Sequence, residues 1–127
     1  MIKILHVLEF YDQVSVDLNK NLGKYKSLDY DKAIKKAQDV NFSWNQLFNE
    51  KNKKYKFIKI YPSNYILQNI WAKTYFRNEI EDLKDIFLKQ INFYNPDIIF
   101  FQKIKFLKKI LKLLPNNIKI YIWDGIN

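Results

Sequence analysis

Four polar side chains that can take part in chemistry follow apolar runs of this sequence. Tyr11 and Asp12 come shortly after the first run, and Gln102 and Asp124 directly follow two later runs. A carboxylate such as that of Asp12 can act as a general base, and phenol, amide and carboxylate groups bind ligands through hydrogen bonds. If the apolar runs are parallel strands, these side chains lie at the carboxyl edge of one sheet, where open α/β sheets bind ligands. The sequence therefore predicts a site at this edge, with solvated turns and loop caps as the alternative interpretation.

The single histidine, His6, stands inside the first apolar run. An imidazole can transfer protons near neutral pH, so a catalytic role stays open, but we expect a core or strand-end histidine. One histidine and no cysteine leave no His cluster and no Cys-based zinc site, so we expect no metal. The carboxylates show no spacing from which a hydrolase pair can be recognised.

The stretch from Asn95 to Gln102 is expected to form the central strand. Pro96 ends the preceding helix, because its ring and missing N–H cannot continue one, and it favours extended backbone at Asn95. The four large apolar residues at 98–101 form a run that is apolar on both faces, as in a parallel sheet covered by helices on both sides.

Three further strands are predicted at residues 2–8, 55–61 and 118–123. Lys56 and Lys59 within the second of these suit a position near the edge of a sheet. Apolar residues at helical spacing predict helices at 29–39, from about 43, at 65–75, at 78–94 and at 104–114, with Ser63 or Asn64 as a cap. Residues 14–28 are interpreted as a long loop in which a turn of helix stays open.

Because strands alternate with helices, the predicted fold class is α/β. We expect a single Rossmann-like, three-layer domain over residues 1–127, with a parallel sheet of about four strands in the order 2-1-3-4. The turn after the first strand has no glycine, and the chain contains only Gly23 and Gly125. A Gly-rich loop that holds a dinucleotide phosphate is therefore absent from the sequence, and NAD or FAD is not expected as a cofactor.

The chain is basic, with 22 Lys and Arg against 13 Asp and Glu and a net charge of +9. Such a charge can attract nucleic acid or an anionic membrane surface. Only Arg77 is an arginine, and specific readout of bases relies on bidentate arginine, so we do not expect nucleic acid as a partner. A solvated lysine surface is the favoured interpretation, and a membrane contact of the basic segment 103–113 stays open.

No apolar run approaches the roughly 18–20 residues that span a bilayer, and the first ten residues do not resemble a signal peptide. A cytoplasmic location is expected. The sequence stops soon after the last predicted strand, which suggests the front half of a longer protein.

Several segments carry a resemblance. In chain order they read KILHV at 3–7 followed by Tyr11 and Asp12, FSW at 42–44, LQNIWAK at 67–73 and QINFYNPDIIFFQ at 90–102. Together they resemble the amino-terminal domain of GT-B-fold glycosyltransferases, especially the bacterial group related to spore-maturation and capsule or lipopolysaccharide transferases. The resemblance covers essentially the whole chain. It departs at Lys103, where the family commonly has an aspartate, so no acidic role is carried over to that position.

The resemblance implies an enzyme that moves a sugar from a nucleotide-sugar donor to a glycan or lipid-linked acceptor, usually without a metal. This chain would be its acceptor-side domain, and the donor would bind a carboxyl-terminal domain outside these residues. No cofactor is then expected here, and the 127 residues alone would be inactive. Polysaccharide biosynthesis would place the enzyme in the cytoplasm, with a peripheral position at the inner face of the membrane left open.

The resemblance also implies roles for the four polar residues. Asp12 would accept the proton of the attacking hydroxyl, and Tyr11 would stack on a sugar ring. Gln102 and Asp124 would bind acceptor hydroxyls. The alternative function is a non-catalytic Rossmann-like binding or scaffold domain.

Overall fold

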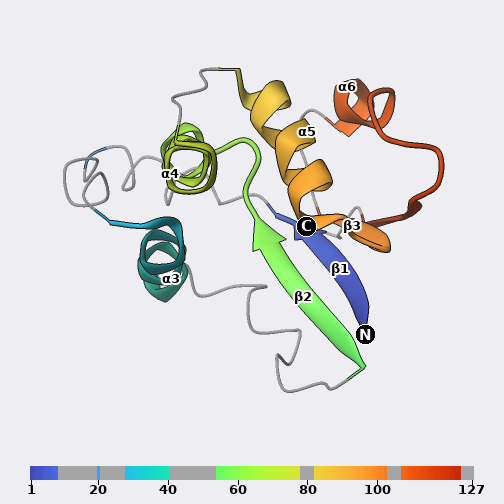
Figure 1. Cartoon of the computed structure of the whole chain (residues 1–127), viewed down its shortest axis with the longest axis horizontal. Coiled ribbons are helices and arrows are strands. Elements are labelled where there is room, and N and C mark those ends of the chain that lie inside the picture. The colour runs from blue at the N-terminus through green and yellow to red at the C-terminus, as the bar shows by residue number, and fades with distance from the viewer. Residues whose placement is uncertain (9–19, 21–27, 41–53, 78–81, 103–106, 124–127) are drawn as a thin grey trace.

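The computed structural model describes residues 1–8, 20, 28–40, 54–77, 82–102 and 107–123, and the structural statements that follow concern this part of the chain. Strands and helices alternate along it (Figure 1). In chain order the elements are β1 (Ile2–Val7), α3 (Tyr30–Val40), β2 (Tyr55–Ile60), α4 (Tyr65–Phe76), α5 (Leu83–Tyr94), β3 (Ile98–Gln102), α6 (Leu107–Leu111) and β4 (Lys119–Trp123).

The four strands form one sheet in the order β2-β1-β3-β4, and every neighbouring pair is parallel. The predicted α/β class, parallel sheet and strand order are thereby confirmed. The chain passes from β1 to β2 on one side and reaches β3 on the other, so the order reverses between β1 and β3. The helix predicted from about residue 43 and the loop at 14–28 lie largely outside the described residues.

Reciprocal hydrogen bonds join β1 to the residue before β3. The backbone N–H of Lys3 donates to Oδ2 of Asp97 at 2.8 Å, and the N–H of Asp97 donates to the carbonyl of Lys3 at 2.9 Å. The extended backbone predicted for Asn95 is wrong, because this residue is left-handed, with φ 46° and ψ 60°. Asparagine tolerates this region, and the Asn95 N–H closes α5 by donating to the carbonyl of Ile91 at 2.9 Å.

Three helix starts have side-chain caps, and at the start of α3 the N–H of Lys32 donates to Oδ1 of Asp29 at 2.9 Å. Oδ1 of Asn64 accepts a hydrogen bond from the N–H of Leu67 and so caps α4, one of the two caps expected there. Oδ1 of Asp82 accepts from the N–H of Lys84, so helix α5 begins at Leu83, later than the predicted residue 78.

The main core lies between one face of the sheet and the helices α5 and α6. Alternate residues of a strand point to the same face, so Leu5 and Val7 of β1 meet Ile99 and Phe101 of β3 there. Burying a large apolar side chain contributes about 1.5–3 kcal/mol. The buried residues of this core are Leu5, Val7, Ile60, Phe87, Ile91, Ile99, Phe101, Ile110 and Leu114.

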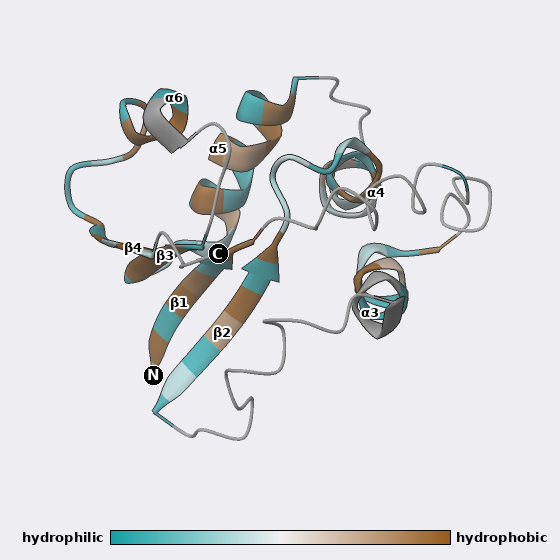
Figure 2. Ribbon diagram, turned by 180° about the vertical axis from the view of Figure 1, so that it is seen from behind, coloured by the Kyte–Doolittle hydropathy of each residue, from teal (hydrophilic) through white to brown (hydrophobic). Residues whose placement is uncertain are grey.

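Helices α3 and α4 pack against each other beside β2, and α4 also contacts α5 (Figures 1 and 2). Gln68 of α4 and Gln90 of α5 are fully buried and exchange two amide hydrogen bonds, at 2.7 and 2.9 Å. Figure 2 shows hydrophilic residues among the apolar ones along β2, in agreement with its outer position in the sheet.

Candidate functional site

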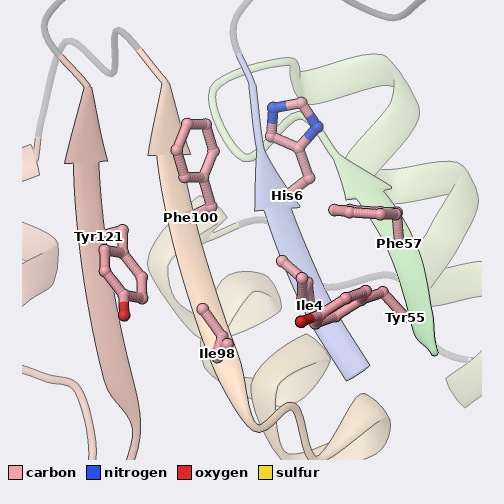
Figure 3. A pocket seen from close by; sticks show the side chains of 7 residues that line it. All are labelled: Ile4, His6, Tyr55, Phe57, Ile98, Phe100 and Tyr121. Atoms are coloured by element: carbon pink, nitrogen blue, oxygen red, sulfur yellow. The ribbon is translucent and has the colours of Figure 1, made fainter. Parts of the chain in front are cut away.

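The face of the sheet opposite α5 and α6 is hollowed by a cavity of about 300 Å³. Figure 3 shows that its lining side chains project from all four strands on the same side of the sheet. Their alternation along each strand follows from the pleat, and their register across strands follows from the parallel pairing. The lining residues are Ile4, His6, Tyr55, Phe57, Ile98, Phe100 and Tyr121.

His6 lies at the upper end of this cavity in Figure 3, toward the carboxyl ends of the strands, and forms a buried polar pair with Gln102. Nε2 of His6 and Oε1 of Gln102 are 2.7 Å apart, and the two side chains are 0% and 3% exposed. Because an amide oxygen only accepts hydrogen bonds, this contact places a proton on Nε2 of His6. Phe100 packs against the imidazole in a T-shaped arrangement with ring centroids 5.3 Å apart. The ring of His6 is therefore held in one orientation.

Burial lowers the pKa of His6 from 6.5 to about 4, because the charged form cannot be solvated there. The hydrogen bond that His6 donates to Gln102 raises the pKa, and the positive charge of Lys59 lowers it further. At neutral pH the imidazole is therefore uncharged. It can take part in hydrogen bonding at this place, but it contributes no positive charge to a ligand.

The His6–Gln102 pair joins the two strands between which the strand order reverses, β1 and β3. In open α/β sheets the connections on either side of such a reversal lead away to opposite sides, and ligands bind in the crevice at the carboxyl ends. Within the described residues Nε2 of Gln102 is buried and has no hydrogen-bond partner. A polar pair at this position, with an amide N–H still able to donate, is suited to hold an oxygen atom of a ligand.

Of the four predicted site residues, the structure describes Gln102. Gln102 ends β3, as expected from the sequence, and contacts His6, which was interpreted as a core or strand-end histidine and is fully buried. Tyr11, Asp12 and Asp124 lie outside the described residues, so the proximity predicted for them is untested.

The sequence interpretation did not single out the aromatic residues of the cavity. The signal that identifies them is the two-residue period: Tyr55 and Phe57 alternate along β2, and Phe100 and Tyr121 face each other in the register of β3 and β4. Assigning these alternate positions to one face requires the strand register, which the spacing within one strand does not give.

A second cavity, of about 400 Å³, lies between α3 and β2 and contains three tyrosines. Nε1 of Trp71 donates to the hydroxyl of Tyr94 at 2.9 Å, and the hydroxyl of Tyr75 donates to Oδ1 of Asp31 at 3.3 Å. Burial raises the pKa of Tyr94 to about 12, so its hydroxyl keeps its proton at neutral pH. The lining residues are Tyr30, Asp31, Ile34, Lys56, Phe57, Ile58, Lys59, Tyr75 and Tyr94.

Within the ranges that the structure describes, no three His, Cys, Asp or Glu side chains are grouped so that they could hold a metal ion. Among the same residues, no helix has the length and apolar character needed to cross a bilayer. No protein-family model, curated protein or solved structure matches this chain.

Proposed function

We propose that this chain is the acceptor-binding domain of a GT-B-type glycosyltransferase, acting on a glycan or lipid-linked acceptor. The observation that carries the proposal is the buried His6–Gln102 pair at the reversal of strand order between β1 and β3. The resemblance of the sequence supplies the reaction class. In this proposal the nucleotide-sugar binds a second domain outside these residues, and the enzyme works in the cytoplasm, at the inner face of the membrane where the acceptor is lipid-linked.

The chemistry of the pair supports an uncharged, hydroxyl-bearing acceptor. His6 is neutral at physiological pH, and the amide nitrogen of Gln102 is a neutral donor. The adjacent wall is aromatic, with Phe57, Phe100 and Tyr121 lining the cavity. Flat apolar rings beside a few fixed hydrogen-bonding groups are typical of pockets for small molecules. The chain has no Gly-rich loop of the kind that usually holds a nucleotide diphosphate.

The proposal is tested by comparing two classes of ligand on the 127-residue chain. Isothermal titration with a panel of neutral di- and trisaccharides should show binding by at least one of them, and UDP-glucose should bind none or far more weakly. Gln102→Ala should weaken saccharide binding by roughly 3- to 10-fold, since one hydrogen bond is lost. The matched control is Gln68→Ala, which removes a buried amide away from the cavity. Binding of UDP-glucose but of no saccharide would refute the acceptor role.

A non-catalytic Rossmann-like binding or scaffold domain is the second candidate. The half-open aromatic face of the sheet favours it, because Tyr121 at the cavity is 46% exposed. Exposed apolar surface of this kind often marks a contact with another molecule. This candidate predicts no transfer of sugar by any longer protein that contains the chain.

A further inference from the structure

The face of the sheet that carries the cavity is apolar in its centre and has a lysine on each outer strand. Lys59 of β2 lies opposite His6 in the strand register, and Lys119 of β4 lies opposite Ile98. Residues paired in register share a face, so both lysines stand on the cavity side. The residues of this face from β2 to β4 are Tyr55, Phe57, Lys59, Ile2, Ile4, His6, Ile98, Phe100, Gln102, Lys119, Tyr121 and Trp123.

The charged side chains that the described strand residues place on this face are lysines. None of its described strand residues is an Asp or Glu, and burial keeps His6 neutral. Nζ of Lys119 lies 5.8 Å from the ring centroid of Tyr121, which itself lines the cavity. The positive charge is therefore placed at the rim of the apolar cavity, in a chain whose net charge is +9.

The cavity is open enough to admit a ligand. Ile4, Phe57 and Phe100 of its wall are half-buried, and Tyr121 is 46% exposed. The opposite face differs, because its central residues Leu5 and Ile99 are 0% exposed beneath the helices. The cavity side thus offers apolar area that a bound molecule can still remove from water.

We propose that this cavity binds an anionic amphiphile, a molecule with an apolar chain or ring and a phosphate or carboxylate group. The apolar part packs against Ile4, Ile98 and the aromatic wall, and the anion lies beside the ammonium group of Lys119. The ligand is taken up as a single molecule, because the lining residues surround a concave space within the face of the sheet. The inference deepens the proposed acceptor role, on which its biological meaning rests, by selecting the lipid-linked acceptors.

Decyl phosphate, used below the concentration at which it forms micelles, is a direct probe. Methyl NMR spectra of the 127-residue chain should show saturable shifts of the Ile4 and Ile98 methyl groups. Inorganic phosphate at the same concentration should leave these signals unchanged, because it lacks the apolar part. Decyltrimethylammonium should bind at least several-fold more weakly, because its charge is repelled by Lys59 and Lys119.

Two variants test the two halves of the ligand. Lys119→Gln, an exposed change, should weaken decyl phosphate binding by roughly 2- to 5-fold and leave decanol binding unchanged. Lys84→Gln on α5 is the matched control, because it removes an exposed lysine elsewhere and should change neither. Ile98→Trp should fill the cavity and abolish the shift of the Ile4 methyl group.

Several outcomes would overturn the inference: equal shifts with inorganic phosphate alone, equal affinity for the cationic detergent, or shifts that spare Ile4 and Ile98. The inference would also be overturned if the chain sedimented with phosphatidylglycerol vesicles but did not bind monomeric decyl phosphate. That result would assign the lysines to a membrane surface. A different result would refute the acceptor proposal alone. Binding of decyl phosphate without binding of any saccharide would retain the amphiphile site and remove the neutral-acceptor role of Gln102.

Discussion

At the scale of single residues, the structure gives His6 and Gln102 a relationship that neither position indicates alone. His6 is one residue among the apolar positions of β1, and Gln102 is the last residue of β3, 96 residues later. Their contact could not be predicted from the sequence, because it depends on β1 and β3 being neighbours in the correct register. What could be predicted is the position of Gln102 at a carboxyl edge, because it follows a continuous apolar run.

The neutral state of His6 makes the stability of the fold depend on pH. Its pKa is about 4 in the native state and 6.5 in the unfolded chain, so the unfolded state binds more protons between these values. This contribution is fully present above pH 6.5 and is lost as pH falls toward 4, by on the order of 3 kcal/mol. Urea unfolding of the wild type and of His6→Gln across pH 4–7 measures it. The free energy of unfolding should change less with pH in the variant than in the wild type. An equal pH dependence of the two would contradict a buried neutral imidazole.

The hydrogen bond between His6 and Gln102 can be tested independently of pH. Gln102→Leu keeps the approximate volume but leaves the Nε2–H of the buried imidazole without its acceptor. The free energy of unfolding should fall by about 1–3 kcal/mol at pH 7. In ¹⁵N NMR spectra the imidazole should also lose its strong preference for the Nε2–H form. An unchanged tautomer in Gln102→Leu would show that another group fixes it.

At the scale of elements, local sequence signals account for most of the helices and strands. Asn64 caps α4 as its residue type suggests, and Pro96 follows the end of α5. The exact backbone at that end differs from expectation, because hydrogen bonding of Asn95 outweighs the preference for extended backbone before proline. The start of α5 is set by Asp82, which was not distinguished in the sequence from the neighbouring polar residues.

The paired glutamines between α4 and α5 also escaped prediction, because two buried amides satisfy each other only through tertiary contact. Gln68→Leu should destabilise the protein by about 1–3 kcal/mol, since the Gln90 amide then stays buried without a partner. The double variant Gln68→Leu/Gln90→Leu should recover part of this loss, because no buried polar group is left unpaired. A double-mutant cycle on urea unfolding measures the coupling, and strictly additive losses would contradict a mutually dependent pair.

At the scale of the whole molecule, the alternation of apolar strands with amphipathic helices predicted a parallel sheet and its order. Right-handed crossovers leave few arrangements for four such units, so the order 2-1-3-4 could be expected. The aromatic cavity and its flanking lysines could not, because they require the register of four strands. The fold thus brings a neutral polar pair, an aromatic wall and a positive rim to one side of the sheet.

The most direct test of the acceptor role is a map of where an acceptor binds. Amide and aromatic NMR spectra of the isotope-labelled chain would be recorded during titration with the best-binding neutral saccharide. The account predicts that the largest shifts fall on the His6 and Gln102 side chains and on the neighbouring ring of Phe100. Saturable shifts confined to residues away from the carboxyl ends of β1 and β3, with no change at His6 or Gln102, would contradict it.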